Sequence, residues 1–337
     1  MMKRQFARLR LGECGPNVSR LCLSARMFGN GTEEHEAAEM IARFGQAGGN
    51  FINAAGSDAE GTAERIIGRA IRRDRDRWII ADAATPPAKA RSNARGPSGA
   101  WLRQAVDRSR DHLGVAKIDL YYLCLDDWMT GLEETIETLG EMIEAGKIGG
   151  WGFSNLRAWR IAELVRIADC LDVPRPVAAQ SYYHALYRLM EMDYLPACAH
   201  FGIGVVAYAP LARGILSDEF SSGSERSSYV GPQDPVVMET AFRPAAIDAV
   251  RAIARHLQPS GRAITGFALQ WVLANRLVSS VLIRPKSMAQ LDSYLSAVET
   301  SYTLNDEAFM NELVPSGNFV GTAYLNLKSA HIGRVVG

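Results

Sequence analysis

The sequence predicts one α/β domain folded as a closed (β/α)8 barrel, and three observations lead to this fold class. Short apolar runs alternate with amphipathic helical stretches, a pattern that implies parallel strands joined by helical crossovers. Eight such strand–helix units follow one another without interruption, which favours a closed barrel over an open sheet. No GxGxxG turn follows the first strand, which argues against an open dinucleotide-binding sheet.

The first four units are defined by apolar runs and by helix start and stop signals. Strands are expected at residues 21–24, 50–54, 78–83 and 117–125, and helices at residues 33–47, 62–72, 98–113 and 133–145. Thr32 is the expected N-cap of the first helix because its hydroxyl can accept a hydrogen bond from a free backbone N–H. Gly48 and Gly49 are expected to end that helix.

The second four units repeat this pattern with longer insertions. Strands are expected at residues 149–153, 177–180, 204–207 and 280–283, and helices at residues 156–167, 194–200, 245–256, 263–274 and 287–298. Residues 1–337 therefore read as a single domain. Roughly residues 1–19 form an N-terminal cap segment, and roughly residues 300–337 form a C-terminal tail.

Two irregular segments follow predicted strands. Residues 86–97 are rich in Pro and Arg, and residues 217–235 are rich in Ser, Gly and Asp. In a (β/α)8 barrel, loops that follow strands lie on the C-terminal face, where ligand sites are built. Each segment is either a cover over a ligand or a plain surface loop, and the sequence leaves both readings open.

Composition excludes several classes of function. Lys and Arg together number 37, as do Asp and Glu, so no net positive charge is present to hold nucleic acid or an anionic membrane. Five cysteines without a CxxC pair favour a reduced, cytoplasmic protein over a disulfide framework or a metal site. No apolar run approaches the roughly 18 residues of a membrane-spanning helix, and the N-terminus lacks the apolar core of a signal peptide.

Several segments resemble the aldo-keto reductases, including the branch that contains the potassium-channel β-subunits. The most distinctive are WGFSNL, QSYYH and AYAPLARG, and the matching stretches run in family order over most of the chain, from about residue 5 to residue 315. The resemblance implies an aldo-keto-reductase-type barrel. It also implies hydride transfer from NADPH to a carbonyl, with a small carbonyl or sugar-like molecule as the expected ligand.

The family's reaction uses a tyrosine that donates a proton, a lysine paired with an aspartate, and a histidine that orients the carbonyl. A proton donor and a nearby positive charge stabilise the alkoxide that forms in this reaction. Matched motif by motif, the aspartate falls on Asn53, the tyrosine on Asp58, the lysine on Ala83 and the histidine on Cys124. All four positions of the catalytic tetrad therefore carry substitutions.

The substitutions agree with one another chemically. A lysine without its acidic partner would be costly in a barrel interior, and here both residues are replaced. Arg26, at the end of the first strand, could form a new polar cluster with Asp58 and Asp82, or the three could simply pair and fill the old pocket. Cys124 reads as a small hydrophobic residue rather than as a nucleophile, because no base is supplied to it.

The nicotinamide end of the cofactor site matches the family well. Ser154, Asn155 and Gln180 match the residues that hydrogen-bond the nicotinamide amide, and Tyr208 matches the ring that stacks on it. Each has an ordinary alternative: Ser154 could be the N-cap of a helix starting at Leu156, and Tyr208 could be a core aromatic residue.

The pyrophosphate and adenine end matches less well. The expected contacts on this end are Leu211, Arg213, Arg284, Lys286, Gln290 and Tyr294. Arg284 and Lys286 could hold a phosphate. Gln290 replaces a common arginine, and Ser293 with Tyr294 replaces the Glu-Asn pair that holds the adenine in the family. The resemblance therefore implies NADP(H) binding that is weaker than in a typical member.

Three functional hypotheses remain open at this level. The protein binds NADP(H) without conventional carbonyl reduction, as a sensor, scaffold or partner subunit. Alternatively, it is an oxidoreductase of altered chemistry that uses Asp58 or Arg26 as a substitute group. In the third hypothesis it is an ordinary reductase with an unrecognised proton donor. The sequence gives neither the substrate nor the oligomeric state.

Overall fold

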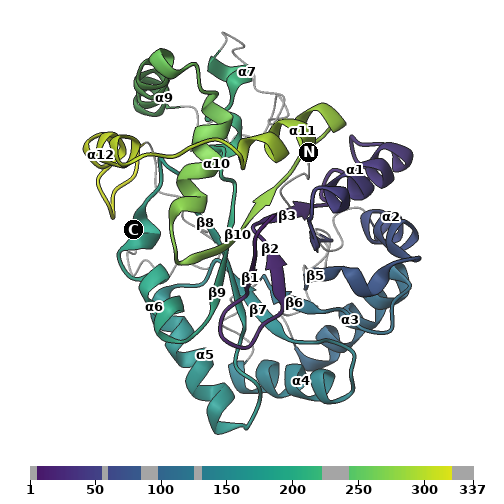
Figure 1. The fold of residues 1–337 in the computed structure, drawn as a ribbon. Helices are drawn as coiled ribbons and strands as arrows, with labels where there is room; N and C mark the ends of the chain where they lie inside the picture. Colours follow the sequence, from purple (N-terminus) through teal and green to yellow (C-terminus); the bar gives the residue numbers. More distant parts are fainter. Residues whose placement is uncertain (1–5, 55–59, 85–97, 125–130, 222–242, 321–337) are drawn as a thin grey trace, which may run out of the picture.

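The computed structural model describes residues 6–54, 60–84, 98–124, 131–221 and 243–320 and confirms a closed barrel of eight parallel strands (Figure 1). Each strand pairs with the next along the chain, and the last closes on the first. The strands are β3 Leu21–Ser24, β4 Phe51–Asn53, β5 Ile79–Ala84, β6 Leu120–Leu123, β7 Trp151–Ser154, β8 Ala178–Tyr182, β9 Gly204–Tyr208 and β10 Val278–Ile283.

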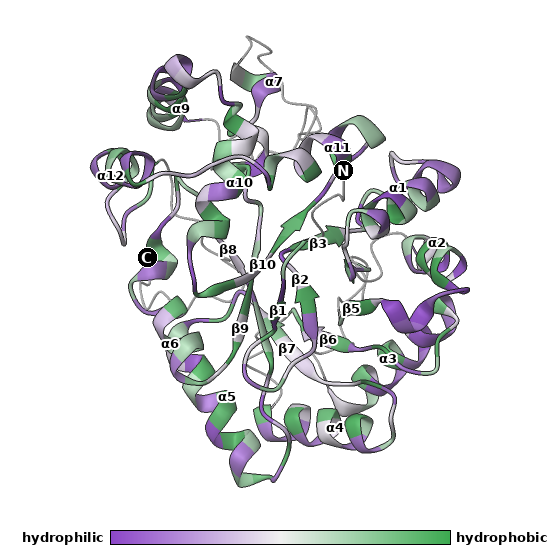
Figure 2. Cartoon of the chain, in the orientation of Figure 1, coloured by the Kyte–Doolittle hydropathy of each residue, from purple (hydrophilic) through white to green (hydrophobic). Residues whose placement is uncertain are grey.

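Helices surround the barrel and bury their apolar faces against it, as Figures 1 and 2 show. Their bounds are α1 Glu34–Gln46, α2 Thr62–Ile71, α3 Gly99–Leu113, α4 Leu132–Glu144, α5 Ala158–Cys170, α6 Tyr194–His200, α7 Asp218–Ser221, α9 Pro244–Leu257, α10 Ile264–Ala274, α11 Met288–Ala297 and α12 Leu304–Leu313. All the helices that periodicity predicted within the described residues are present, and their ends differ from the prediction by a few residues.

The barrel interior is a separate apolar cluster, built from alternate residues of the strands because successive side chains point to opposite faces. Its strand members are Cys22, Phe51, Ala81, Leu120, Tyr122, Ala178 and Val206. Ala83 and Cys124 pack against the same cluster. This parity identifies the side chains that face inward at the C-terminal ends of the strands.

The predicted N-terminal cap segment contains a β-hairpin, which the sequence analysis did not anticipate. Strands β1 Arg8–Arg10 and β2 Asn17–Ser19 pair in antiparallel fashion. Leu11 and Val18 of this hairpin join the interior cluster. The backbone N–H of Glu13 donates to the carbonyl of Gly202, just before β9. The hairpin therefore closes the N-terminal end of the barrel, opposite the face where strand-following loops lie.

Two local predictions were incomplete or wrong. Thr32 is not the N-cap of α1, because Glu33 occupies that position and the Thr32 hydroxyl donates to the carbonyl of Lys286 over 2.9 Å. The predicted C-terminal tail contains a regular helix, α12. Thr303 and Asp306 form a capping box at its start, a signal that the sequence analysis overlooked.

The two irregular segments are largely outside the described residues. Residues 86–97 lie entirely outside them, and of residues 217–235 only 217–221, which include α7, are described. Within the described ranges, no helix combines the length and apolar character needed to cross a membrane.

Candidate functional site

Three of the four tetrad positions lie together at the C-terminal ends of adjacent strands. Asn53 is the last residue of β4, Ala83 is the fifth of six residues in β5, and Cys124 directly follows β6. Asn53 comes two residues after the inward-facing Phe51, so the pleat directs it to the same side. Asp58, the fourth position, lies outside the described residues.

This corner of the barrel offers neutral groups. Asn53 is 5% exposed and its amide does not ionise. Cys22 and Tyr122 pack in the interior cluster beneath it. Burial raises the pKa of the Cys22 thiol and of the Tyr122 phenol well above their usual values, so both remain protonated at neutral pH. The described part of the corner therefore holds no charge that could stabilise an alkoxide.

Asp82 faces the opposite side of β5 and does not enter the pocket, so its predicted clustering with Arg26 was wrong. The interior parity of Ala81 and Ala83 turns Asp82 outward, toward the helices. There it is fully buried beside Glu64 of α2 and Ser109 of α3. Burial and the charge of Glu64 raise the pKa of Asp82 to about 8.

Arg26 lies just beyond β3, with an exposed side chain. Its backbone N–H donates to the hydroxyl of Ser24, the last residue of β3, over 3.4 Å. Ser24 is 4% exposed and is paired with Asn53 in the strand register. Ser24 was not among the residues predicted from the sequence, although its place at the end of the first strand is the signal that would have identified it.

The four predicted nicotinamide residues meet at the ends of β7, β8 and β9. Ser154 pairs with Gln180 in the parallel register. The Tyr208 phenol donates to Asn155 Oδ1 over 2.8 Å, and Asn155 Nδ2 donates to Ser154 Oγ over 3.0 Å. The backbone N–H of Asn155 donates to the carbonyl of Gln180. The structure thus joins these four residues into one hydrogen-bonded group.

Local geometry decides between the alternatives for these residues. Helix α5 begins at Ala158 with Arg157 as its N-cap, so Ser154 is not the helix cap. Tyr208 is half-buried at the open end of β9 rather than enclosed in the core. The Nε2 of Gln180 is buried and has no hydrogen-bond partner among the described residues. A carboxamide oxygen would satisfy this donor, so the residues present fit a nicotinamide.

The loop after β9 holds an unusual backbone. Ala209, Ala212 and Arg213 all have positive φ, near +56°, +47° and +59°. Residues other than glycine are strained in this conformation, and strained backbone is common at functional sites. Leu211 in this loop is buried, and the Arg213 guanidinium lies 5.9 Å from the ring centre of Tyr182. The strained loop is where the family pattern places the pyrophosphate.

Two cations lie close together at the end of β10. Arg284 directly follows β10, and Lys286 comes two residues later; both are half-buried. Burial and then the charge of Arg284 lower the pKa of Lys286, an arrangement that an anion would relieve. Gln290 accepts a hydrogen bond from the backbone of Lys286 and contacts Glu219 of α7. Gln290 therefore supports the loop instead of extending into solvent.

Tyr294 does not fit its predicted role as an adenine contact. Its side chain is 2% exposed and belongs to the main hydrophobic core beneath α11. A ring enclosed in the core offers no surface for stacking on a base. The alignment placed Tyr294 at a family contact position, but its apolar ring turns inward, which the helix periodicity could have indicated.

The segment after β8 adds an aromatic wall that the sequence analysis missed. The ring centre of Tyr182 lies 4.7 Å from that of His184 and 5.5 Å from that of Tyr208. The backbone N–H of Leu186 donates to His184 Nδ1. Burial and then the charge of Arg213 lower the pKa of His184 to about 3, so the imidazole is neutral. Tyr182 and His184 lie within the QSYYH motif, in which only Gln180 was predicted to have a role.

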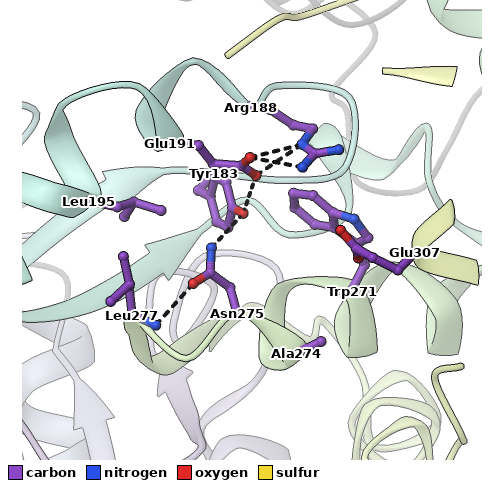
Figure 3. A pocket seen from close by; sticks show the side chains of 9 residues that line it. All are labelled: Tyr183, Arg188, Glu191, Leu195, Trp271, Ala274, Asn275, Leu277 and Glu307. Atoms are coloured by element: carbon purple, nitrogen blue, oxygen red, sulfur yellow. Dashed lines mark hydrogen bonds and ion pairs between the residues drawn. The ribbon is translucent and has the colours of Figure 1, made fainter. Parts of the chain in front are cut away.

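A hollow of about 300 Å³ lies outside the barrel, between the segment after β8 and helices α10 and α12 (Figure 3). Tyr183 donates to Glu191, and Arg188 forms an ion pair with Glu191. Arg188 also donates to Asn311 and to the carbonyl of Val314. These bonds engage all three guanidinium nitrogens, so we interpret the network as a structural link that holds α12 against the segment after β8.

Comparisons with known proteins agree with this architecture. The sequence profile described as "Aldo/keto reductase family" matches residues 20–313. An uncharacterized oxidoreductase, YrpG of Bacillus subtilis, is 29% identical over 90% of this chain and 95% of its own length. Norsolorinic acid reductase A of Aspergillus parasiticus is 30% identical over 68% of this chain and 63% of its own length. A probable voltage-gated potassium channel subunit beta of Arabidopsis thaliana is 28% identical over 86% of this chain and 90% of its own length.

Proposed function

Because this chain belongs to the aldo/keto reductase family, we propose that it binds NADP(H) but does not carry out conventional carbonyl reduction. Its role is that of a cofactor-binding sensor or partner subunit in the cytoplasm. The relatives include proteins named as reductases and proteins named as potassium channel subunits, so enzymes and partner subunits both occur among them. The small-molecule ligand expected beside the cofactor is a carbonyl or sugar-like compound.

The proposal rests on the difference between the ends of strands β7 to β9 and the ends of strands β4 to β6. The ends of β7, β8 and β9 hold a connected polar group with one buried donor, Gln180 Nε2, without a partner among the described residues. The ends of β4, β5 and β6 hold Asn53, Ala83 and Cys124, which supply neither a cation nor a strong general acid. Features suited to cofactor binding are thus present beside a corner whose described residues supply none of the family's catalytic groups.

The residues that would hold the cofactor have distinct tasks. Ser154, Asn155 and Gln180 orient the carboxamide, and Tyr208 offers a ring face to the nicotinamide. Arg284 and Lys286 are suited to the 2′-phosphate because a paired cationic site favours a doubly charged oxyanion. When bound, NADPH supplies a hydride donor, but this chain's own residues at the tetrad positions do not stabilise the charge that develops on an acceptor oxygen.

The magnitude of the expected loss is large. General acid catalysis typically contributes about 10²–10⁴-fold, and electrostatic stabilisation of the oxyanion contributes a further large factor. Ala83 provides neither charge nor hydrogen bond from its side chain. We therefore expect negligible NADPH-dependent reduction of common aldehydes at neutral pH, with at most a faint rate that arises from proximity to the nicotinamide.

Fluorescence titration with NADPH and a turnover assay with aromatic aldehydes test the proposal together. We expect saturable NADPH binding and no turnover above background. Robust turnover would show that another residue donates the proton and would overturn the proposal. An absence of binding at millimolar NADPH would equally overturn it. Exchange of the bound nicotinamide's redox state with a specific metabolite would instead favour altered chemistry.

A further inference from the structure

A second hollow, of about 680 Å³, lies at the opposite end of the barrel from the cofactor site. It lies between the C-terminal ends of α2 and α3, over the starts of β5 and β6. Ile79, the first residue of β5, and Asp119, the residue before β6, form part of its floor. We refer to this hollow as the basic groove. Its volume is within the range of small-molecule sites.

The walls of the basic groove carry an excess of positive charge. Its cations are Arg65, Arg69, Arg72, Arg75 and Lys117, and its carboxylates are Asp76 and Asp119. One carboxylate is already neutralised: Arg75 binds Asp119 over 2.7 Å. Arg75 also donates to the carbonyls of Trp78 and Lys117. This pair therefore fixes the floor and leaves the remaining cations opposed by a single acidic side chain.

Three of these cations have no acidic partner among the described residues and could therefore bind an anionic ligand. In the described ranges, the side chains of Arg72 and Lys117 form no ion pair or hydrogen bond. Arg65 donates only to a backbone carbonyl, that of Glu60, which leaves its charge uncompensated. Arg69, like Arg75, already has an acidic partner, in this case Glu34, which lies outside the groove. Three cations from two facing segments are thus available at one hollow.

An imidazole, that of His112, also belongs to the groove. His112 lines the basic groove, and its Nδ1 lies 2.6 Å from Glu64 Oε2. An adjacent carboxylate favours the protonated imidazole. Nevertheless, burial, followed by the charges of Arg65 and Arg108, lowers the pKa of His112. Burial is the largest cause of this shift, and the two arginines act in the same direction.

The shape of the basic groove is set by close backbone packing. A Cβ atom on Gly68 would lie 2.1 Å from the carbonyl oxygen of Leu113, so only glycine lets α2 approach α3 here. The Schellman-type turn at Gly114 returns its N–H to the carbonyls of Arg110 and Asp111. The fold therefore fixes the positions of the two helix ends, and with them the shape of the groove.

We propose that the basic groove is a binding site for a small molecule that carries a diphosphate group. Guanidinium groups bind phosphoryl oxygens through paired hydrogen bonds, and a diphosphate supplies enough negative charge to match three available cations. The net charge of zero for the whole chain argues against a general affinity for nucleic acid. The site is distinct from the proposed cofactor site, because it lies at the N-terminal ends of the strands.

Calorimetric titration of the full chain with inorganic pyrophosphate tests this proposal. Two double variants separate the two cationic sites: Arg72→Gln with Lys117→Gln in the groove, and Arg284→Gln with Lys286→Gln at the end of β10. Arg255→Gln on α9 is a control for the loss of an exposed arginine elsewhere. Circular dichroism melting of each variant checks that these surface changes leave the fold intact.

We expect the groove variant to weaken pyrophosphate binding at least tenfold, whereas the other two variants retain the affinity of the unmodified chain. Binding should weaken steeply with added salt, because the contacts are ionic. The proposal would be overturned by a loss confined to the Arg284 and Lys286 variant, by equal losses in all variants, or by the absence of binding at millimolar pyrophosphate and low salt. None of these outcomes depends on whether NADPH binds.

Discussion

Tyr208 and Asn155 are joined by a 2.8 Å hydrogen bond that connects the end of β9 to the end of β7 across β8. The bond fixes the phenol ring at the strand ends and at the same time orients the Asn155 amide, whose nitrogen donates to Ser154. Asn155 has a positive φ of about 60°, a conformation that asparagine tolerates better than most residues. The group is therefore set in position before any ligand binds.

This relationship separates two contributions of Tyr208 to NADPH affinity. Replacing Tyr208 with Phe keeps the ring but removes the bond to Asn155, so we expect NADPH to bind about 2- to 10-fold more weakly, as the loss of one hydrogen bond implies. Replacing Tyr208 with Ala also removes the stacking surface, and the loss should be clearly larger. Fluorescence titration measures both, and equal affinities for the two variants would contradict the stacking role.

The two cations beyond β10 make a separate prediction about cofactor choice. The double change of Arg284 and Lys286 to Gln should weaken NADPH binding by about 10-fold or more, because charge-assisted hydrogen bonds to a phosphate are lost. NADH, which lacks the 2′-phosphate, should lose little. Parallel titrations with the two nucleotides check this, and an equal loss for both would place the 2′-phosphate elsewhere.

Restoring the tetrad tests whether the corner at β4, β5 and β6 is a degraded reductase site. We expect the combined change of Asn53→Asp, Asp58→Tyr, Ala83→Lys and Cys124→His to produce measurable aldehyde reduction. Each single change should remain inactive, because the four groups act as a unit. Ala83→Lys alone is also expected to lower the Tm, since it places an unpaired ammonium against the interior cluster.

The readout for the restored variant is NADPH consumption with an aromatic aldehyde, and NADPH titration of the same variant is the control. A restored tetrad that binds NADPH and folds, yet shows no turnover above the unmodified chain, would contradict the interpretation of this corner as a former reductase site. Single variants that gain most of the activity would show that the other substitutions are not limiting.

Much of the barrel follows from the sequence because its signals are periodic and local. Alternating apolar runs located all eight strands, and motif order placed Ser154 and Gln180 on neighbouring strands before the structure paired them. The β1–β2 hairpin was not predicted, because β1 is exposed and shows no apolar run. The barrel strand β4 is equally short, but its three residues are buried and begin with an apolar pair that the sequence shows.

The candidate site was harder to predict wherever the direction of a side chain decided its role. Asp82 is adjacent to Ala83 in sequence, yet the pleat sends the two side chains to opposite faces. Tyr294 occupies a family contact position but turns into the core. His184 is made neutral by surroundings that come from distant segments, including Arg213. Strand phase and long-range packing settle these cases, and a single sequence reports them only indirectly.

The buried Asp82 makes a prediction about stability and pH. Its pKa is raised to about 8, by burial above all and then by Glu64, whereas an exposed aspartate titrates near 4. Around the pair lie Ser109, which donates to Glu64 over 2.8 Å, and His112, while Tyr121 of β6 also faces Asp82. The folded chain therefore holds a proton on Asp82 at pH values where the unfolded chain has released it.

The sign of the effect follows from that difference. Stabilisation by the bound proton is complete below about pH 4 and is lost as the pH rises toward 8, so this group makes the chain less stable in alkaline solution.

Asp82→Asn keeps the shape and a hydrogen-bond donor but does not titrate. We expect this variant to match the unmodified chain near pH 5 and to melt roughly 2–4 °C higher near pH 8.5. Asp248→Asn, at an exposed carboxylate on α9, should show no such pH-dependent gain. Melting curves from pH 5 to pH 8.5 decide the matter: an Asp82→Asn variant whose Tm runs parallel to that of the unmodified chain would mean that Asp82 does not hold the proton.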